Sequence, residues 1–140
     1  FLASKIVWMD AFITNIDRTF YNTNLLWWHK ELWIIDNGAS FYFHHSWNDV
    51  DTAAKTPFRY IKDHVLLSQA TLLDEADTFA KTVLNKQVFR DIVNLLPDEW
   101  LHWEGTTETP DQIREVYFRF LSTRLEHTDI FLKEAKNARG

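Results

Sequence analysis

The chain has 140 residues and a mass of 16.7 kDa, which suits a single domain with one core. Hydrophobic residues make up 46% of it and aromatic residues 16%, so the composition excludes a disordered chain and predicts either a bulky aromatic core or an exposed aromatic face. The net charge is −5 and there is no basic run, which excludes the electrostatic footprint of a nucleic-acid-binding surface.

The absence of cysteine excludes disulfides, thiol catalysis and cysteine-ligated zinc, and it fits a reducing compartment, so we expect a cytoplasmic protein. No apolar run reaches the ~18 residues of a membrane span, and the N-terminus lacks the pattern of a signal peptide. We therefore expect no contact with a membrane. Because the chain opens on Phe1 without an initiator methionine and its apolar spacing starts at Leu2, we expect a fragment of a longer protein.

The first predicted element is a largely buried helix over residues 1–14. Its apolar residues Leu2, Ile6, Met9 and Ile13 recur at the three- and four-residue intervals of one helix face.

A polar loop and a hairpin follow this helix. The loop is "TNIDRTFYNTN", and the apolar runs "LLWW" at 25–28 and "LWII" at 32–35 come after it. Runs without alternation predict two strands that are buried on both faces and joined as a hairpin. The sequence "DNGAS" then predicts a turn. We expect the hairpin tryptophans, Trp27, Trp28 and Trp33, to pack in the core, with any nucleotide contact left to one face.

Residues 42–57 have an irregular pattern that predicts a long loop. His44 and His45 are expected to pack within this loop rather than to share a metal, because adjacent side chains of an extended chain point apart. Asp49 and Asp51 are expected to be solvated.

The remainder of the chain predicts helices. They cover residues 74–84 and 87–96, followed by a short turn over 98–103 and a final helix that starts after Thr109 and extends through Phe131 and Leu132. "TPDQ" at 109–112 has the hydroxyl cap, proline and glutamine of a capping box. The predicted fold is therefore a mainly α single domain over residues 1–140 with one buried β-hairpin.

Asp17, Asn22 and Asp36 have the order and spacing of a phosphoryl-transfer site. Asn22 follows Asp17 by five residues, and the predicted hairpin then delivers Asp36 in a D-x-G turn. Mg²⁺ prefers oxygen ligands and takes one or two carboxylates beside phosphate and water, so Asp36 and Asn22 are candidate metal ligands. Asp17 is the candidate catalytic residue that accepts the proton of a substrate hydroxyl.

The segment "DAFITNIDRT...NTNLLWW...LWIIDNGAS" resembles the catalytic segment of HipA-family serine/threonine kinases, in particular the HipA-like branch. The motifs match in order from Val7 to about His45. This resemblance implies a mostly helical C-terminal kinase lobe, ATP and Mg²⁺ as cofactors, and a protein substrate. It also implies that Asp17 is the catalytic aspartate and that Asn22 and Asp36 hold the metal.

Asn15 and Arg18 correspond in this resemblance to residues that shape the catalytic loop. The charge of Arg18 has two interpretations. Arg18 either takes part in catalysis or neutralises Asp17 or Asp10 in a structural ion pair.

The chain has three glycines, at positions 38, 105 and 140, so it cannot contain the G-x-G-x-x-G loop that covers the phosphates in protein kinases. We therefore expect the C-terminal lobe alone, without the nucleotide-covering lobe and inactive by itself. Two alternatives stay open. One is a kinase-derived, non-catalytic module that binds a partner protein, and the other is a metal-dependent phosphohydrolase.

A missing lobe would leave apolar surface bare. We expect self-association through the face that carries Phe1, Leu2, Val7 or the hairpin tryptophans, unless the C-terminal helix folds back to cover it.

Overall fold

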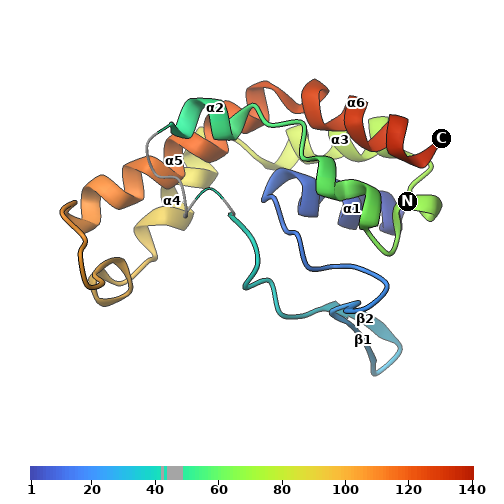
Figure 1. Ribbon diagram of the computed structural model, residues 1–140, viewed down its shortest axis with the longest axis horizontal. Coiled ribbons are helices and arrows are strands. Elements are labelled where there is room, and N and C mark those ends of the chain that lie inside the picture. The colour runs from blue at the N-terminus through green and yellow to red at the C-terminus, as the bar shows by residue number, and fades with distance from the viewer. Residues whose placement is uncertain (42, 44–48) are drawn as a thin grey trace.

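The computed structural model describes residues 1–41, 43 and 49–140. Within these ranges the chain forms α-helices, short 3₁₀ helices and one two-stranded antiparallel sheet, so the prediction of a mainly α fold with one β-hairpin is confirmed (Figure 1). The α-helices are α1 (Leu2–Phe12), α2 (Val50–Ala54), α3 (Leu73–Val83), α4 (Lys86–Asn94), α5 (Pro110–Glu126) and α6 (Thr128–Arg139). The 3₁₀ helices are η2 (Arg59–Asp63), η3 (Leu67–Gln69) and η4 (Asp98–Leu101), and the strands are β1 (Leu25–Trp28) and β2 (Glu31–Ile34).

Helix α1 lies on the side of the helical body that faces the hairpin and contacts α3, α6 and η3 (Figure 1). Trp8 stacks on Phe12 with 4.9 Å between the ring centroids, and Phe131 of α6 meets the Trp8 ring edge-on at 5.7 Å. The indole N–H of Trp8 donates a hydrogen bond to Asp77 of α3 at 2.9 Å. Since both flanks of α1 are packed, the helix is a rigid base for the loop that follows it.

Arg124 of α5 fixes the C-terminal end of α1. Its side chain is fully buried and donates to the carbonyl oxygens of Ala11, Phe12, Ala54 and Thr56, with distances of 2.8 Å to Phe12 and 2.9 Å to both Ala54 and Thr56. These carbonyls lie at or just beyond the ends of α1 and α2, where helical partners run out. Burial lowers the pKa of Arg124 to about 9.

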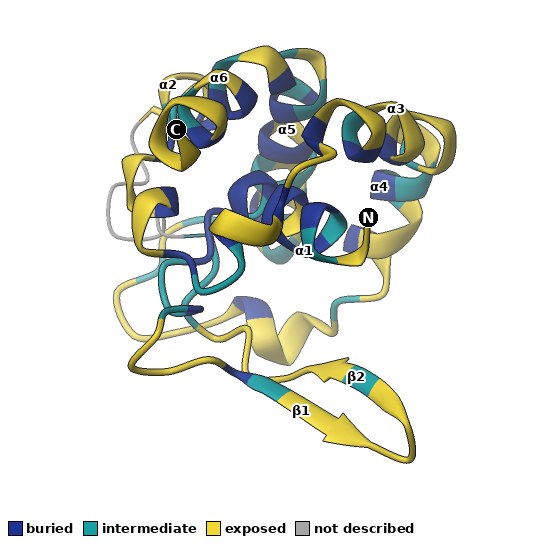
Figure 2. Cartoon of the chain, turned by 90° about the vertical axis from the view of Figure 1, so that its right-hand side faces the viewer, coloured by how far each residue is buried: buried dark blue, intermediate teal, exposed yellow. Residues whose placement is uncertain are grey.

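The hairpin is exposed, so the prediction that it is buried on both faces is wrong for this chain. Figure 2 shows it projecting from the helical body, and the tryptophans expected in the core, Trp27, Trp28 and Trp33, are 67%, 56% and 49% exposed. Continuous apolar runs are typical of strands covered on both faces, but β1 and β2 pair only with each other among the described strands. The tip consists of His29 and Lys30, both at positive φ, as a two-residue type I′ turn requires.

Helix α6 covers α1 and α3 and lies on the opposite side of α1 from the hairpin, so it leaves the hairpin uncovered (Figure 1). Phe1 and Leu2 are about half exposed, as expected of a bare face, whereas Val7 is completely buried and belongs to the core.

Three expectations for the chain after the hairpin have different outcomes. The expected loop contains α2, which Asp49 caps by accepting a hydrogen bond from the Thr52 N–H at 3.0 Å, while the residues 42 and 44–48, with His44 and His45, lie outside the described part. The capping box at Thr109 is confirmed. The expected single last helix is split at His127, whose φ of −124° and ψ of 38° are not helical.

Asp51 lies within α2 and forms a half-exposed ion pair with Arg119 at 2.8 Å, so it is partly solvated and also paired. In the part of the chain that the structure describes, no helix has the length and apolar character needed to span a membrane.

Candidate functional site

The candidate catalytic loop begins with a reversal at the end of α1. Thr14 has a positive φ of 54°, and the N–H of Asn15 returns to the carbonyl of Asp10 at 2.9 Å. The Asn15 side chain makes two hydrogen bonds. Its Nδ2 donates to Asp10 Oδ1 at 3.0 Å, and its Oδ1 accepts a hydrogen bond from the N–H of Asp17 at 3.1 Å. Asn15 thus holds the backbone of Asp17 against the last turn of α1.

Arg18 forms a buried ion pair with Asp10 of α1. Arg18 Nε lies 2.6 Å from Asp10 Oδ2, and Nη2 lies 3.3 Å from Asp10 Oδ1, so the contact is bidentate. Both side chains are almost completely buried. The acid that neutralises Arg18 is therefore Asp10, not Asp17, one of the two structural pairs that the sequence left open.

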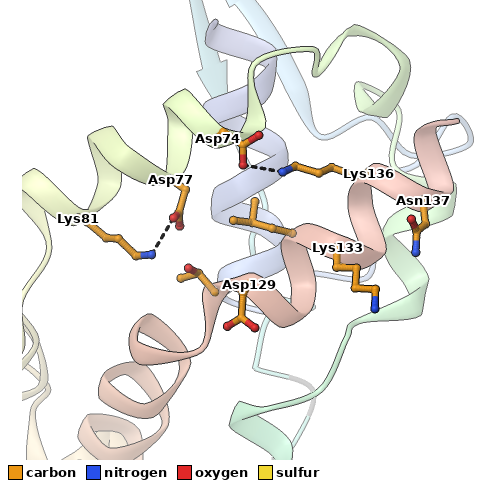
Figure 3. A pocket seen from close by; sticks show the side chains of 9 residues that line it. Asp74, Asp77, Lys81, Asp129, Lys133, Lys136 and Asn137 are labelled. Carbon is orange, nitrogen blue, oxygen red and sulfur yellow. Dashed lines mark hydrogen bonds and ion pairs between the residues drawn. The ribbon is translucent and has the colours of Figure 1, made fainter.

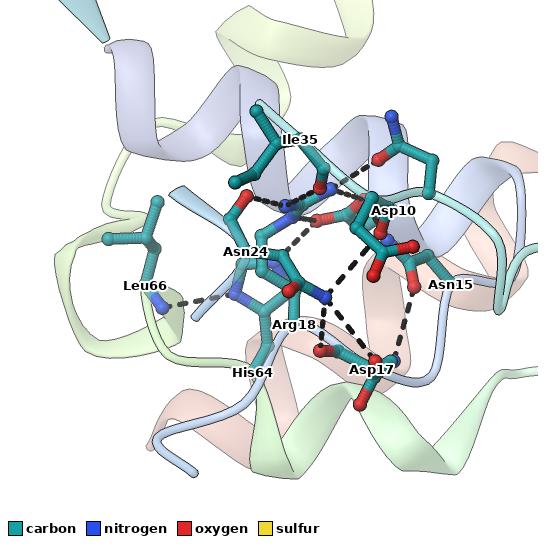
Figure 4. Close-up of polar contacts among 10 residues, drawn as sticks. Asp10, Asn15, Asp17, Arg18, Asn24, Ile35, His64 and Leu66 are labelled. Atoms are coloured by element: carbon teal, nitrogen blue, oxygen red, sulfur yellow. Dashed lines mark hydrogen bonds and ion pairs between the residues drawn. The ribbon is translucent and has the colours of Figure 1, made fainter. Parts of the chain in front are cut away.

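The guanidinium of Arg18 also reaches both ends of the hairpin. Its Nη1 donates to the carbonyl of Asn24, before β1, at 2.6 Å and more weakly to that of Ile35, after β2, at 3.4 Å. Its Nη2 donates to Asn37 Oδ1 at 2.5 Å. One buried cation therefore ties α1, the loop, the base of the hairpin and the turn after it into one unit (Figure 4).

His64 completes this cluster and was not identified from the sequence. Its Nε2 lies 2.8 Å from Asp10 Oδ2, while its Nδ1 accepts the N–H of Leu66 at 3.0 Å. Because Nδ1 accepts, the proton of the neutral ring is on Nε2 and is donated to Asp10. A backbone hydrogen bond also joins the His64 segment to the loop, since the Val65 N–H donates to the carbonyl of Arg18 at 3.0 Å.

Asp10 is held in its charged form by this cluster. Burial acts to raise the pKa of Asp10, but the hydrogen bonds from His64 and Arg18 and the Arg18 charge outweigh burial, so the pKa lies below its ordinary value. His64 is separated from Asp10 by 54 residues, and no local pattern in the sequence links the two.

Asp17 and Asn22, two of the predicted site residues, are in contact. Asn22 Nδ2 donates to Asp17 Oδ2 at 2.8 Å, which leaves the amide oxygen of Asn22 as the atom that a cation can bind. Asp17 is half-buried and Asn22 is exposed, so the contact lies at the surface and is accessible to a ligand.

Asn24 connects these residues to Asp36 and was also missed as a site residue. Its Nδ2 lies 3.1 Å from the carbonyl of Asp17, 3.3 Å from Asp17 Oδ2 and 3.4 Å from the carbonyl of Asp36. Asn24 has a φ of 48°, a conformation in which asparagine is enriched. The signal in the sequence was the asparagine-rich end of the loop, "NTN".

Asp36 lies at the surface, just after β2. Its φ is 48°, and its Oδ1 is 3.4 Å from the N–H of Gly38, the pattern of an aspartate that folds over its own turn. The backbone of Asp36 is thus placed beside Asp17 through Asn24, and its carboxylate is exposed.

The donor set suits a hard cation such as Mg²⁺, which prefers carboxylate and amide oxygens and takes few carboxylates. Among the described residues no cluster of three or more His, Asp or Glu side chains is present, so this part of the chain has no closed all-protein metal cage. Asp17 and Asn22 are joined through their side chains, whereas Asp36 is joined to Asn24 through its backbone carbonyl and its Oδ1 faces its own turn.

A polar cavity of about 380 Å³ lies between α3 and α6, away from this loop (Figure 3). Asp74 is 2.5 Å from Lys136, and Asp77 is 2.7 Å from Lys81. Lysines pair with these two carboxylates, and their positive charge opposes the binding of a cation in the cavity.

Comparisons with known protein families, curated proteins and solved structures find no match for this chain.

Proposed function

We propose that this chain carries the catalytic and metal-binding segment of a HipA-like, ATP- and Mg²⁺-dependent kinase, which transfers the γ-phosphoryl group of ATP to a serine or threonine hydroxyl of a protein. The observation that supports it best is the meeting of two segments at Asn24. The loop with Asp17 and Asn22 and the turn with Asp36 are joined there by hydrogen bonds.

In this proposal Asp17 orients the substrate hydroxyl and accepts its proton, a role that requires a carboxylate at the surface and free to face a substrate. Asp36 and Asn22 hold Mg²⁺, which, when bound, neutralises the charge that develops on the phosphates. Asn15 and Arg18 act on the position of the loop, because they contact Asp10 of α1 and backbone atoms and not the Asp17 carboxylate.

The proposal predicts a cation site at the loop and the turn. We expect Mn²⁺, used as a paramagnetic substitute for Mg²⁺, to broaden the amide NMR signals of Asp17, Asn22, Asp36 and Gly38 before those of other residues. The Asp36→Asn variant removes one ligand charge and should lose this selective broadening. The measurement is a titration of the whole chain with Mn²⁺ alone, recorded by ¹H–¹⁵N correlation spectra.

The Asp111→Asn variant is the matched control, because Asp111 is an exposed carboxylate at the start of α5, paired with Arg114. In this variant Mn²⁺ should broaden the same amide signals as in the unmodified chain. Broadening centred on Asp74 and Asp77 in the cavity of Figure 3, or an unchanged response of Asp36→Asn, would contradict the proposed metal site.

The alternative function is a non-catalytic module that binds a partner protein, and the observation that favours it is the exposed aromatic hairpin. The Mn²⁺ titration described above distinguishes the two functions. A binding module requires no selective metal site at Asp17, Asn22 and Asp36, whereas the kinase segment does.

A further inference from the structure

The hairpin exposes a large apolar surface. Six of its large apolar side chains are between 41% and 67% exposed: Leu26, Trp27, Trp28, Trp33, Ile34 and Ile35. At about 150–250 Å² for a large aromatic side chain, these residues leave roughly 600 Å² of apolar area in contact with water. This area is divided between the two faces of the hairpin, and its sum is comparable to the largest apolar patch of a typical monomer, about 300–600 Å².

Both faces of the hairpin are apolar. The register pairs Trp27 with Leu32 and Leu26 with Trp33, and neighbouring residues of a strand point to opposite faces. One face therefore carries Trp27, and the other carries Leu26, Trp28 and Trp33. A sheet with one solvated face would alternate polar and apolar residues. This one does not.

The outer edge of β1 is open. Figure 2 shows β1 on the side of the hairpin away from the helices, and β1 pairs only with β2 in the described sheet. The Ile35 N–H donates to the Asn24 carbonyl, so the alternation of an antiparallel pair directs the backbone groups of Leu26 and Trp28 towards β2. The N–H and carbonyl groups of Leu25 and Trp27 consequently point outwards.

This edge lacks the features that protect edge strands. "LLWW" contains no charge and no proline, and the structure pairs it with β2 without a bulge. The charged residues Lys30 and Glu31 lie at the tip and carry opposite signs, so the hairpin itself has no net charge that opposes association.

We infer that the outer edge of β1 is the contact surface for a second copy of this chain, which pairs β1 with β1 in antiparallel orientation about a twofold axis. With Leu25 of each copy opposite Trp27 of the other, every outward backbone group of the two residues finds a partner, and a four-stranded sheet results. The same strand edge serves on both sides, so the surface is self-complementary. This inference depends on the hairpin alone and not on the proposed kinase site.

The arrangement places Leu26 of one copy directly opposite Leu26 of the other. The position is not hydrogen-bonded, and such antiparallel pairs have Cα atoms about 4.5 Å apart. Disulfides form at Cα separations of about 4.4–6.8 Å. The chain has no native cysteine, so Leu26→Cys introduces a single thiol whose disulfide can only join two copies.

We expect the Leu26→Cys variant to form a disulfide-linked dimer on mild oxidation at micromolar concentration, as seen on a non-reducing gel. The control is Tyr21→Cys, which places a fully exposed thiol outside the strands and should cross-link at least about tenfold more slowly. Equal rates for the two variants would overturn the inference, because collision of exposed thiols would then explain the product.

The second test is analytical ultracentrifugation of the wild-type chain, which contains no cysteine. We expect a monomer–dimer equilibrium that Trp27→Lys weakens at least about tenfold, since a charge on an edge strand opposes pairing. Trp100→Lys, which alters an equally exposed tryptophan on η4, should leave it unchanged. A wild-type chain that stays monomeric at high micromolar concentration, or an equal loss in both variants, would overturn the inference. Circular dichroism verifies that each variant keeps its helices.

Discussion

At the scale of single residues, the buried cluster of Asp10, Arg18 and His64 determines the position of the candidate loop. Asp10→Asn keeps the shape of the side chain but removes the charge that compensates Arg18. A buried ion left without its partner destabilises a fold by about 3–5 kcal/mol. We expect a loss of that size in the free energy of unfolding, measured by urea denaturation followed by circular dichroism.

Asp51→Asn is the matched control for this prediction, since its ion pair with Arg119 is half exposed and should change stability by less than about 1 kcal/mol. The dependence on pH gives a second check. Because the folded pKa of Asp10 is lowered, its stabilisation is complete above the unfolded pKa of about 4 and is lost as the pH falls through the lower folded value. The difference between Asp10→Asn and the wild type should therefore shrink in acid. A constant difference would contradict the role of the Asp10 charge.

At the scale of elements, Arg124 holds the ends of two helices that are distant in sequence. Arg124→Met fills a similar volume but leaves the carbonyls of Ala11, Phe12, Ala54 and Thr56 without this donor. Buried carbonyls without a partner cost about 1–3 kcal/mol each before relaxation. We expect a loss of about 3 kcal/mol or more in the free energy of unfolding, again by urea denaturation. Arg119→Met, an exposed change on the same helix, should cost far less, and similar losses would argue against capping by Arg124.

Local signals predicted several elements well, because local interactions determine them. The capping box at Thr109 predicted the start of α5, and the apolar spacing of residues 1–14 predicted α1. The break at His127 was missed, since the apolar spacing continues across it towards Phe131 and Leu132. The hairpin was predicted with the correct pairing of its strands, but its exposure depends on what surrounds it, which a strand pattern does not contain.

The site was only partly predictable for the same reason. Asp17, Asn22 and Asp36 could be proposed from their spacing along the chain, but His64 joins the cluster from 54 residues away and Asn24 is one polar residue among several in its loop. Such contacts are products of the tertiary fold, and a single sequence gives no local evidence for them.

At the scale of the whole molecule, the structure consists of a packed helical body and a projecting hairpin (Figure 2). Segments with few buried contacts open at low free energy, so their amides exchange early. We expect hydrogen exchange at concentrations low enough to keep the chain monomeric to be fastest in β1 and β2 and slowest in α1. Protection of the hairpin equal to that of α1 would contradict this division into body and hairpin.

The distribution of tryptophans affects how the protein can be observed by fluorescence. Of the six tryptophans in the described residues, Trp8 is buried, whereas Trp27, Trp28, Trp33, Trp100 and Trp103 are between 47% and 73% exposed. Indoles in contact with water emit at long wavelength in the folded state as they do in the unfolded chain. Intrinsic emission is therefore an insensitive probe of unfolding here, but a sensitive one for anything that covers the hairpin.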